Sequence, residues 1–143
     1  MKIKFYKCNV CGKVIAVVKD SIGTTMCCNQ PMVEIKMKSK EQDLLEKHVP
    51  TYIRKDNKIV VNVGSTLHPA MKEHHIEWIS LLTNKGYQVR FLEPTRLPVV
   101  TFNVDPDEEV KEISSYCNIH SLYTFCPDNA DDEEDDCGCE INY

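Results

Sequence analysis

Four cysteines within the first 28 residues constrain the fold of this chain more than any other feature. They form two close pairs, Cys8 with Cys11 and Cys27 with Cys28, among short apolar segments. A segment this short has too little core to fold without a staple, and a bound metal ion can supply one. The first pair, followed by Gly12, is typical of a metal knuckle, since two intervening residues let both thiolates reach one ion while glycine permits the tight turn. We predict one four-sulfur site, distorted because Cys27 and Cys28 are adjacent, whose donors suit iron or zinc.

The chain has eight cysteines in 143 residues, a number that also suits a secreted disulfide framework. Lys2, Lys4 and Lys7, however, interrupt the apolar stretch that an export signal needs. The longest apolar run, residues 14–18, is far shorter than the roughly 20 residues of a membrane span. We therefore expect a cytoplasmic protein, with no membrane association, whose cysteines bind metal.

Alternation of apolar and polar residues dominates from residue 51 onward. It is clearest in residues 59–63, 87–91 and 100–104, which are separated by turn-forming residues. Residues 74–82 fit both helical and strand spacing, and we predict a strand. A short helical turn is expected over residues 39–47. The pattern predicts an antiparallel β-sandwich or barrel.

Charge is divided unevenly along the chain. Residues 1–125 hold all 17 basic side chains against 14 acidic ones, a net charge of +3, whereas residues 126–143 hold eight acidic side chains and no basic one. We expect this tail to be a solvated, disordered extension. The alternatives are that Cys137 and Cys139 form a redox disulfide or bind a metal, or that the acidic run docks on a basic donor protein. There is no phosphate-binding glycine loop or basic-aromatic stripe, so nucleic-acid binding is not expected.

Histidines and one further cysteine suggest a second site. Cys117 and His120 are three residues apart, close enough to share an ion. Any single histidine of this chain is better explained as a surface or hydrogen-bonded residue. The five histidines are His48, His68, His74, His75 and His120.

The N-terminal cysteines lie in a recognisable motif. Cys-x2-Cys-Gly followed by Cys-Cys-Asn-Gln-Pro-Met, over residues 8–32, resembles the iron centre of desulforedoxin and of the N-terminal domain of desulfoferrodoxins. The resemblance implies that residues 1–37 form a desulforedoxin-like domain with one iron bound by four cysteines. It also implies that this iron carries single electrons in an auxiliary role.

Three further motifs resemble the catalytic domain of superoxide reductases, the desulfoferrodoxin and neelaredoxin proteins. They are Glu-Lys-His-Val-Pro at residues 46–50, His-Pro at 68–69 with a histidine six residues on, and Cys-Asn-Ile-His at 117–120. The resemblance implies an immunoglobulin-like β-sandwich over residues 38–125, followed by the tail at 126–143. It implies a second iron with an axial thiolate and four equatorial imidazoles, with His75 left outside; the implied ligands are Cys117, His48, His68, His74 and His120.

The resemblance also implies an activity. Superoxide would be reduced by one electron to hydrogen peroxide at this five-ligand iron, a ligand set that does not suit catalytic zinc. Lys47 would attract the anion and orient water, and Glu46 would occupy the sixth position of ferric iron. A donor such as rubredoxin would return the electron, and a homodimer is implied. The alternatives are an electron carrier that uses only the four-cysteine iron and a zinc-stapled binding module.

Two segments depart from the family pattern. Ala70 stands where methionine often follows His-Pro, and Ser121-Leu122-Tyr123 stands where Gly-x-Trp is common. Neither departure changes a ligand, but both could alter the packing behind Cys117 and His120.

Overall fold

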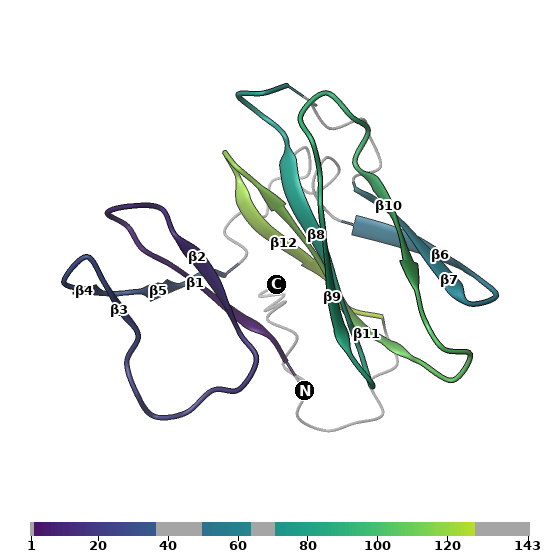
Figure 1. The fold of residues 1–143 in the computed structure, drawn as a ribbon, viewed down its shortest axis with the longest axis horizontal. Coiled ribbons are helices and arrows are strands. Elements are labelled where there is room, and N and C mark those ends of the chain that lie inside the picture. The colour runs from purple at the N-terminus through teal and green to yellow at the C-terminus, as the bar shows by residue number, and fades with distance from the viewer. Residues whose placement is uncertain (1, 37–49, 64–70, 128–143) are drawn as a thin grey trace, which may run out of the picture. The chain divides into compact units, whose positions relative to one another are not determined.

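The structure, a computed structural model, describes residues 2–36, 50–63 and 71–127. Within these ranges the regular secondary structure consists of β-strands alone (Figure 1). The expected mainly-β fold is confirmed. In the described part of the chain, no helix exists that is long and apolar enough to cross a membrane. The chain divides into two compact units, Met1–Lys36 and Met37–Tyr143.

The first unit has a three-stranded antiparallel sheet and a small hairpin. The sheet has the order β2-β1-β5, and the hairpin pairs β3 with β4. Its small core consists of Ile3, Phe5, Cys8, Met32 and Ile35. The strands are β1 (Lys4–Lys7), β2 (Val14–Val17), β3 (Met26–Cys27), β4 (Gln30–Pro31) and β5 (Val33–Glu34).

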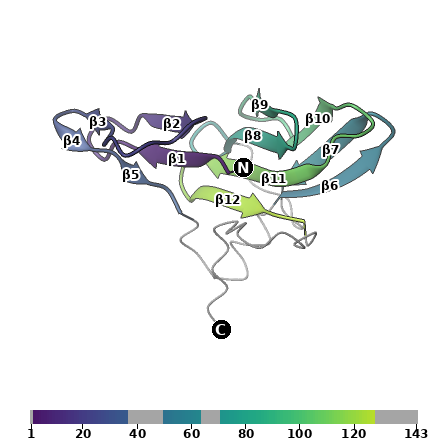
Figure 2. The same ribbon diagram turned by 90° about the horizontal axis from the view of Figure 1, so that it is seen from below.

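The second unit is a sandwich of two antiparallel sheets, which are seen along their edges in Figure 2. One sheet has the order β10-β7-β6 and the other the order β12-β11-β8-β9. The first contains β6 (Pro50–Lys55), β7 (Lys58–Val63) and β10 (Val99–Asn103); the second contains β8 (Ile76–Thr83), β9 (Tyr87–Phe91), β11 (Val110–Cys117) and β12 (Ser121–Phe125).

The sandwich core follows the alternation seen in the sequence. Ile59, Val61 and Val63 of β7 are buried, and Phe102 of β10 faces the same core. Residues 74–82 lead into and form most of β8, so the strand prediction for this segment is confirmed. The helical turn expected at residues 39–47 lies outside the described residues.

Strand β11 organises the second sheet. It pairs with β8 over most of its length and with β12 on its other side. The β8 ladder shifts register between Tyr116 and Cys117, so that Cys117 lies opposite Ile76. The pairing therefore brings the C-terminal end of β11 beside the residues that precede β8.

Candidate metal centres

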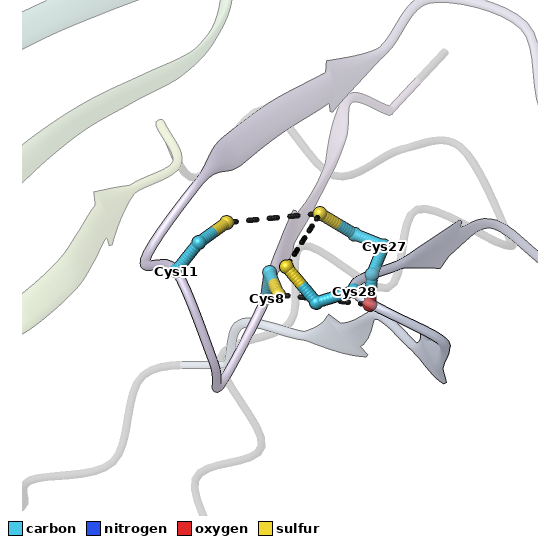
Figure 3. A group of neighbouring side chains, drawn as sticks. All are labelled: Cys8, Cys11, Cys27 and Cys28. Atoms are coloured by element: carbon cyan, nitrogen blue, oxygen red, sulfur yellow. Dashed lines mark hydrogen bonds between the residues drawn. The ribbon is translucent and has the colours of Figure 1, made fainter.

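The four N-terminal cysteines converge, as predicted. Cys8 and Cys11 come from the loop after β1, whereas Cys27 ends β3 and Cys28 begins the turn to β4 (Figure 3). The sulfurs of Cys11 and Cys27 are 3.7 Å apart, those of Cys27 and Cys28 are 3.9 Å apart, and all four lie within 4.8 Å of one another. Four sulfurs in a regular tetrahedron at about 2.3 Å from one ion are separated by about 3.8 Å. The cluster therefore fits a single tetrahedral metal ion.

Two tight turns produce this convergence. In the knuckle, the Gly12 amide donates to the Cys8 carbonyl at 2.9 Å, and Gly12 has a φ of +81°, a conformation in which a side chain would be strained. In the second turn, Cys28 and Asn29 both have positive φ, 51° and 60°, between the paired residues Cys27 and Gln30. These are the dihedrals of a two-residue type I′ hairpin loop. The turn lets two adjacent cysteines present their sulfurs to one point (Figure 3).

The clustered thiols have divergent proton affinities. Backbone N–H groups of Cys11 and Val10 lower the pKa of Cys8 to about 6. Hydrogen bonding to Cys8 and Cys11 raises the pKa of Cys27 to about 12. The pKa of Cys28 is also raised, chiefly by its hydrogen bond with Cys11. Several negative sulfurs cannot coexist here without a compensating cation. A metal ion would supply that charge, so the donor chemistry also fits.

A second cluster joins three of the residues singled out in the sandwich. Nε2 of His74 lies 3.2 Å from Nδ1 of His120, and the Cys117 sulfur lies 3.7 Å from the same Nδ1. All three donor atoms lie within 4.8 Å of one another. Two nitrogens bound at about 2.1 Å and at right angles to each other are separated by about 3.0 Å. The spacing fits a shared ion.

The β11–β12 hairpin positions two of these residues. Cys117 pairs with Ser121, and the three residues between them form the loop that carries His120. Ser121 has a φ of +72°, the left-handed conformation that favours glycine. A side chain at this position therefore stands on a strained backbone.

The sulfur of Cys117 is shielded from solvent, whereas the two imidazoles are half-buried. Burial raises the pKa of the Cys117 thiol, although the N–H groups of His120 and Ile119 favour the thiolate. A cation at this position would tip the balance toward the thiolate. The half-buried imidazoles leave the cluster within reach of solvent.

The other predicted site residues lie outside the described residues. These are His48 and His68, predicted as ligands, and Lys47 and Glu46, predicted to act on the substrate. His75 does not join the cluster; within the described residues, its buried Nδ1 has no hydrogen-bond partner.

Two features of the structure were not anticipated. The side chain of Asn118 forms hydrogen bonds with the backbone on both sides of His74. In the sequence, only the position of Asn118 within the Cys-Asn-Ile-His motif pointed to it. Cys126 is disulfide-bonded. Cys137 and Cys139 lie outside the described residues.

The fold and the two clusters define a β-sandwich protein with a cysteine-rich N-terminal unit and two candidate mononuclear metal centres. Family models describe both parts: the desulfoferrodoxin N-terminal domain matches residues 1–35, and desulfoferrodoxin matches residues 38–125. The chain belongs to the desulfoferrodoxin family.

Individual relatives extend over most of the chain. A desulfoferrodoxin homolog of Archaeoglobus fulgidus is 38% identical over 121 residues, which cover 85% of this chain and 94% of the relative. A desulfoferrodoxin of Desulfarculus baarsii is 35% identical over 83% of this chain and 92% of its own. Among solved structures, the superoxide reductase from Treponema pallidum is similar with a TM-score of 0.72 and 26% identity, covering 87% of this chain and 97% of the solved one.

Proposed function

We propose that this protein is a superoxide reductase, which converts superoxide, one electron and two protons into hydrogen peroxide without releasing oxygen. The observation that carries the proposal is the convergence of His74, Cys117 and His120 at one end of the sandwich. It is supported by similarity to a superoxide reductase over nearly the whole length of that protein.

Two iron ions would be bound per chain. We assign the first to the four N-terminal cysteines and the second to the sandwich cluster, completed by His48 and His68. When bound at the second site, iron would supply the one-electron redox chemistry that the reduction of superoxide needs. A soft thiolate with neutral imidazoles suits both ferrous and ferric iron.

The surrounding residues would handle substrate and protons. Lys47, next to His48 in the sequence, is proposed to draw the anion in and to orient a water that donates a proton. Glu46 is proposed to cover the site after peroxide has left. The half-buried edges of His74 and His120 keep the site open to water, so that protons can be replaced.

An electron must then be returned by a second protein. We propose a rubredoxin-like donor and a homodimeric assembly, both on the basis of family membership. The four-cysteine site would store or relay an electron, because a tetrahedral iron thiolate exchanges one electron with little change in its ligands.

The test is to mix anaerobically reduced protein with superoxide and to measure peroxide and oxygen together. We expect one peroxide per superoxide and no oxygen, whereas a dismutase would release oxygen. Neither product would form above the spontaneous rate if the protein were an electron carrier using only its four-cysteine site, or a zinc-stapled binding module. Release of oxygen, or the absence of both products above the spontaneous rate, would contradict the proposal.

A matched pair of substitutions tests whether the sandwich cluster is the site of the reaction. His120→Ala is expected to lose the second iron and the activity, because it removes one of the converging donors. His75→Ala removes the neighbouring imidazole, which lies outside the cluster, and should keep two irons per chain and full peroxide yield. Equal losses in the two variants would show that the cluster is not the site.

A further inference from the structure

We propose that Asn118 is a positioning residue that holds His74 against Cys117 and His120, and so determines the affinity and ligand geometry of the sandwich metal site. The proposal rests on the proposed function, in that these three residues are taken to bind the metal. In this proposal Asn118 acts through His74 and not on the substrate.

The contacts of Asn118 flank His74 on both sides. Its Oδ1 accepts a hydrogen bond of 3.0 Å from the backbone N–H of His75, and its Nδ2 donates one of 2.9 Å to the carbonyl of Glu73. Its own N–H donates to the His75 carbonyl at 3.3 Å. Three hydrogen bonds therefore tie the loop after β11 to the two residues on either side of His74.

The side-chain hydrogen bonds of Asn118 lie just beyond the end of the pairing between β8 and β11. The described pairing of β11 with β8 stops at Cys117 and Ile76, two residues short of His74. Beyond it, one further backbone hydrogen bond joins the N–H of Asn118 to the carbonyl of His75, and the chain then enters the loop that carries His120. A carboxamide offers an acceptor and a donor like those of a peptide group. Asn118 therefore continues the pairing with its side chain.

An ordinary turn asparagine would behave differently. Asparagine favours turns because its side chain bonds to its own backbone about two residues on. Within the described residues, the side-chain hydrogen bonds of Asn118 instead cross to a segment more than 40 residues earlier in the chain, at Glu73 and His75. The carboxamide thus joins two parts of one cluster rather than stabilising its own loop.

Outer contacts of this kind orient the ligands of a metal site, and their loss typically weakens metal binding about 10- to 100-fold. We expect Asn118→Ala, and Asn118→Leu with a similar volume but no hydrogen bonds, to weaken Co²⁺ binding at the sandwich site by that factor. The visible absorption of Co²⁺ at this site should also change, because the position of the His74 imidazole changes.

The chain supplies two controls. Asn84, at the other end of β8, also donates its N–H to a carbonyl, at Glu109, and accepts the N–H of the same residue with its Oδ1, but it lies far along the strand from the cluster. Asn84→Ala should lower stability to a comparable degree and leave both the affinity and the spectrum unchanged. The four-cysteine site, whose thiolate spectrum differs, reports whether the variant chain is otherwise intact.

The experiment is a Co²⁺ titration of the metal-free full chain against a competing chelator, together with urea unfolding of each variant. If Asn118→Ala is too unstable, Asn118→Gln, which keeps the carboxamide but displaces it by one methylene, provides the same comparison. Asn118 variants that bind Co²⁺ within twofold of the parent, with an unchanged spectrum, would overturn the proposal.

Failure of the proposed function would look different. A parent protein that binds Co²⁺ at a site sensitive to His120→Ala, yet yields no peroxide from superoxide when loaded with iron, would refute the activity and leave the role of Asn118 standing. Conversely, full peroxide yield with no effect of Asn118→Ala on Co²⁺ binding would refute only the role of Asn118.

Discussion

The two candidate metal centres of this chain differ in how the fold brings their donor residues together. The four cysteines lie within 21 residues, on two tight turns, in a unit whose buried apolar side chains are Ile3, Phe5, Cys8, Met32 and Ile35. His74 and His120 lie 46 residues apart, at the end of a sandwich with an extended apolar core. We therefore expect the first unit to need a bound metal in order to fold, and the second unit to fold before it binds one.

Left-handed backbone occurs at both clusters, whereas charge is divided between the two units. In the first unit, Cys28 itself takes the left-handed conformation, at a cost that metal binding can offset. Residues 1–36 carry six lysines against two acidic side chains, a net charge of +4, and residues 37–125 carry 11 basic against 12 acidic ones, a net charge of −1. The positive charge that precedes the tail therefore belongs to the N-terminal unit, and attraction of an anion to the sandwich must depend on local lysines.

The largest expected effect comes from Cys28→Ser. Loss of one of four thiolates should remove the first iron and leave residues 1–36 open to proteolysis, because their small core cannot hold the fold alone. The sandwich should stay folded, keep its iron and give full peroxide yield. Iron content, limited proteolysis and the peroxide assay measure these outcomes.

The reciprocal variant is Cys117→Ser, which should lose the second iron and the activity while residues 1–36 stay protected. A Cys28→Ser protein whose N-terminal unit remained as protected as the parent would break the proposed contrast. Complete loss of superoxide reduction in that variant, with the second iron retained, would show that the first iron is essential rather than auxiliary.

A smaller effect is expected from Lys47→Ala. Since the sandwich carries no net positive charge, one lysine next to a ligand should account for most of the attraction of superoxide. We expect the second-order rate to fall about threefold to tenfold at low ionic strength and the difference to shrink as salt rises. Stopped-flow mixing over a salt series measures it.

Lys85→Ala is the matched control, because Lys85 follows the far end of β8 and pairs with Asp107 at an exposed position. It removes the same charge from the same unit and should leave the rate nearly unchanged. Equal reductions in both variants would mean that net charge, rather than the position of Lys47, governs the encounter.

The smallest effect is expected from Ser121→Gly. The left-handed backbone at Ser121 costs about 1–2 kcal/mol, and glycine relieves it while adding about 0.4–1 kcal/mol of unfolded-state entropy. The free energy of unfolding of the sandwich should rise by about 0.5 kcal/mol in urea titrations. Ser115→Gly, at a buried strand position on β11, should destabilise it instead.

The sequence predicted the strands whose apolar residues alternate but did not single out β11, the strand that carries Cys117. Its central residues, Glu112, Ser114 and Ser115, look polar and exposed. Ser114 is nevertheless fully buried. Its hydroxyl is satisfied there, because it contacts the Thr124 hydroxyl at 3.1 Å and donates to the Glu112 carboxylate. Satisfied hydroxyls can be buried at little cost, and a hydrophobicity pattern does not register this.

Strand β9 was predicted from its alternation, but its apolar residues are not all buried. Tyr87, Val89 and Phe91 alternate and do form a strand, but β9 is the edge of its sheet, and Phe91 is 82% exposed. Alternation indicates which side chains share a face of a strand. Whether that face is covered depends on the neighbouring strands, which the local pattern does not contain.

The sequence by itself indicated the donor atoms and the first cluster, because each cysteine pair lies within one tight turn and only 16 residues separate Cys11 from Cys27. It also determined, through motif resemblance, which residues of the sandwich to examine. Only the tertiary structure decided that His74 reaches Cys117 and His120, since that meeting depends on the register of β8 against β11 and on the carboxamide of Asn118. Contacts between residues so far apart in the chain are set by the packing of whole strands, and no local spacing encodes them.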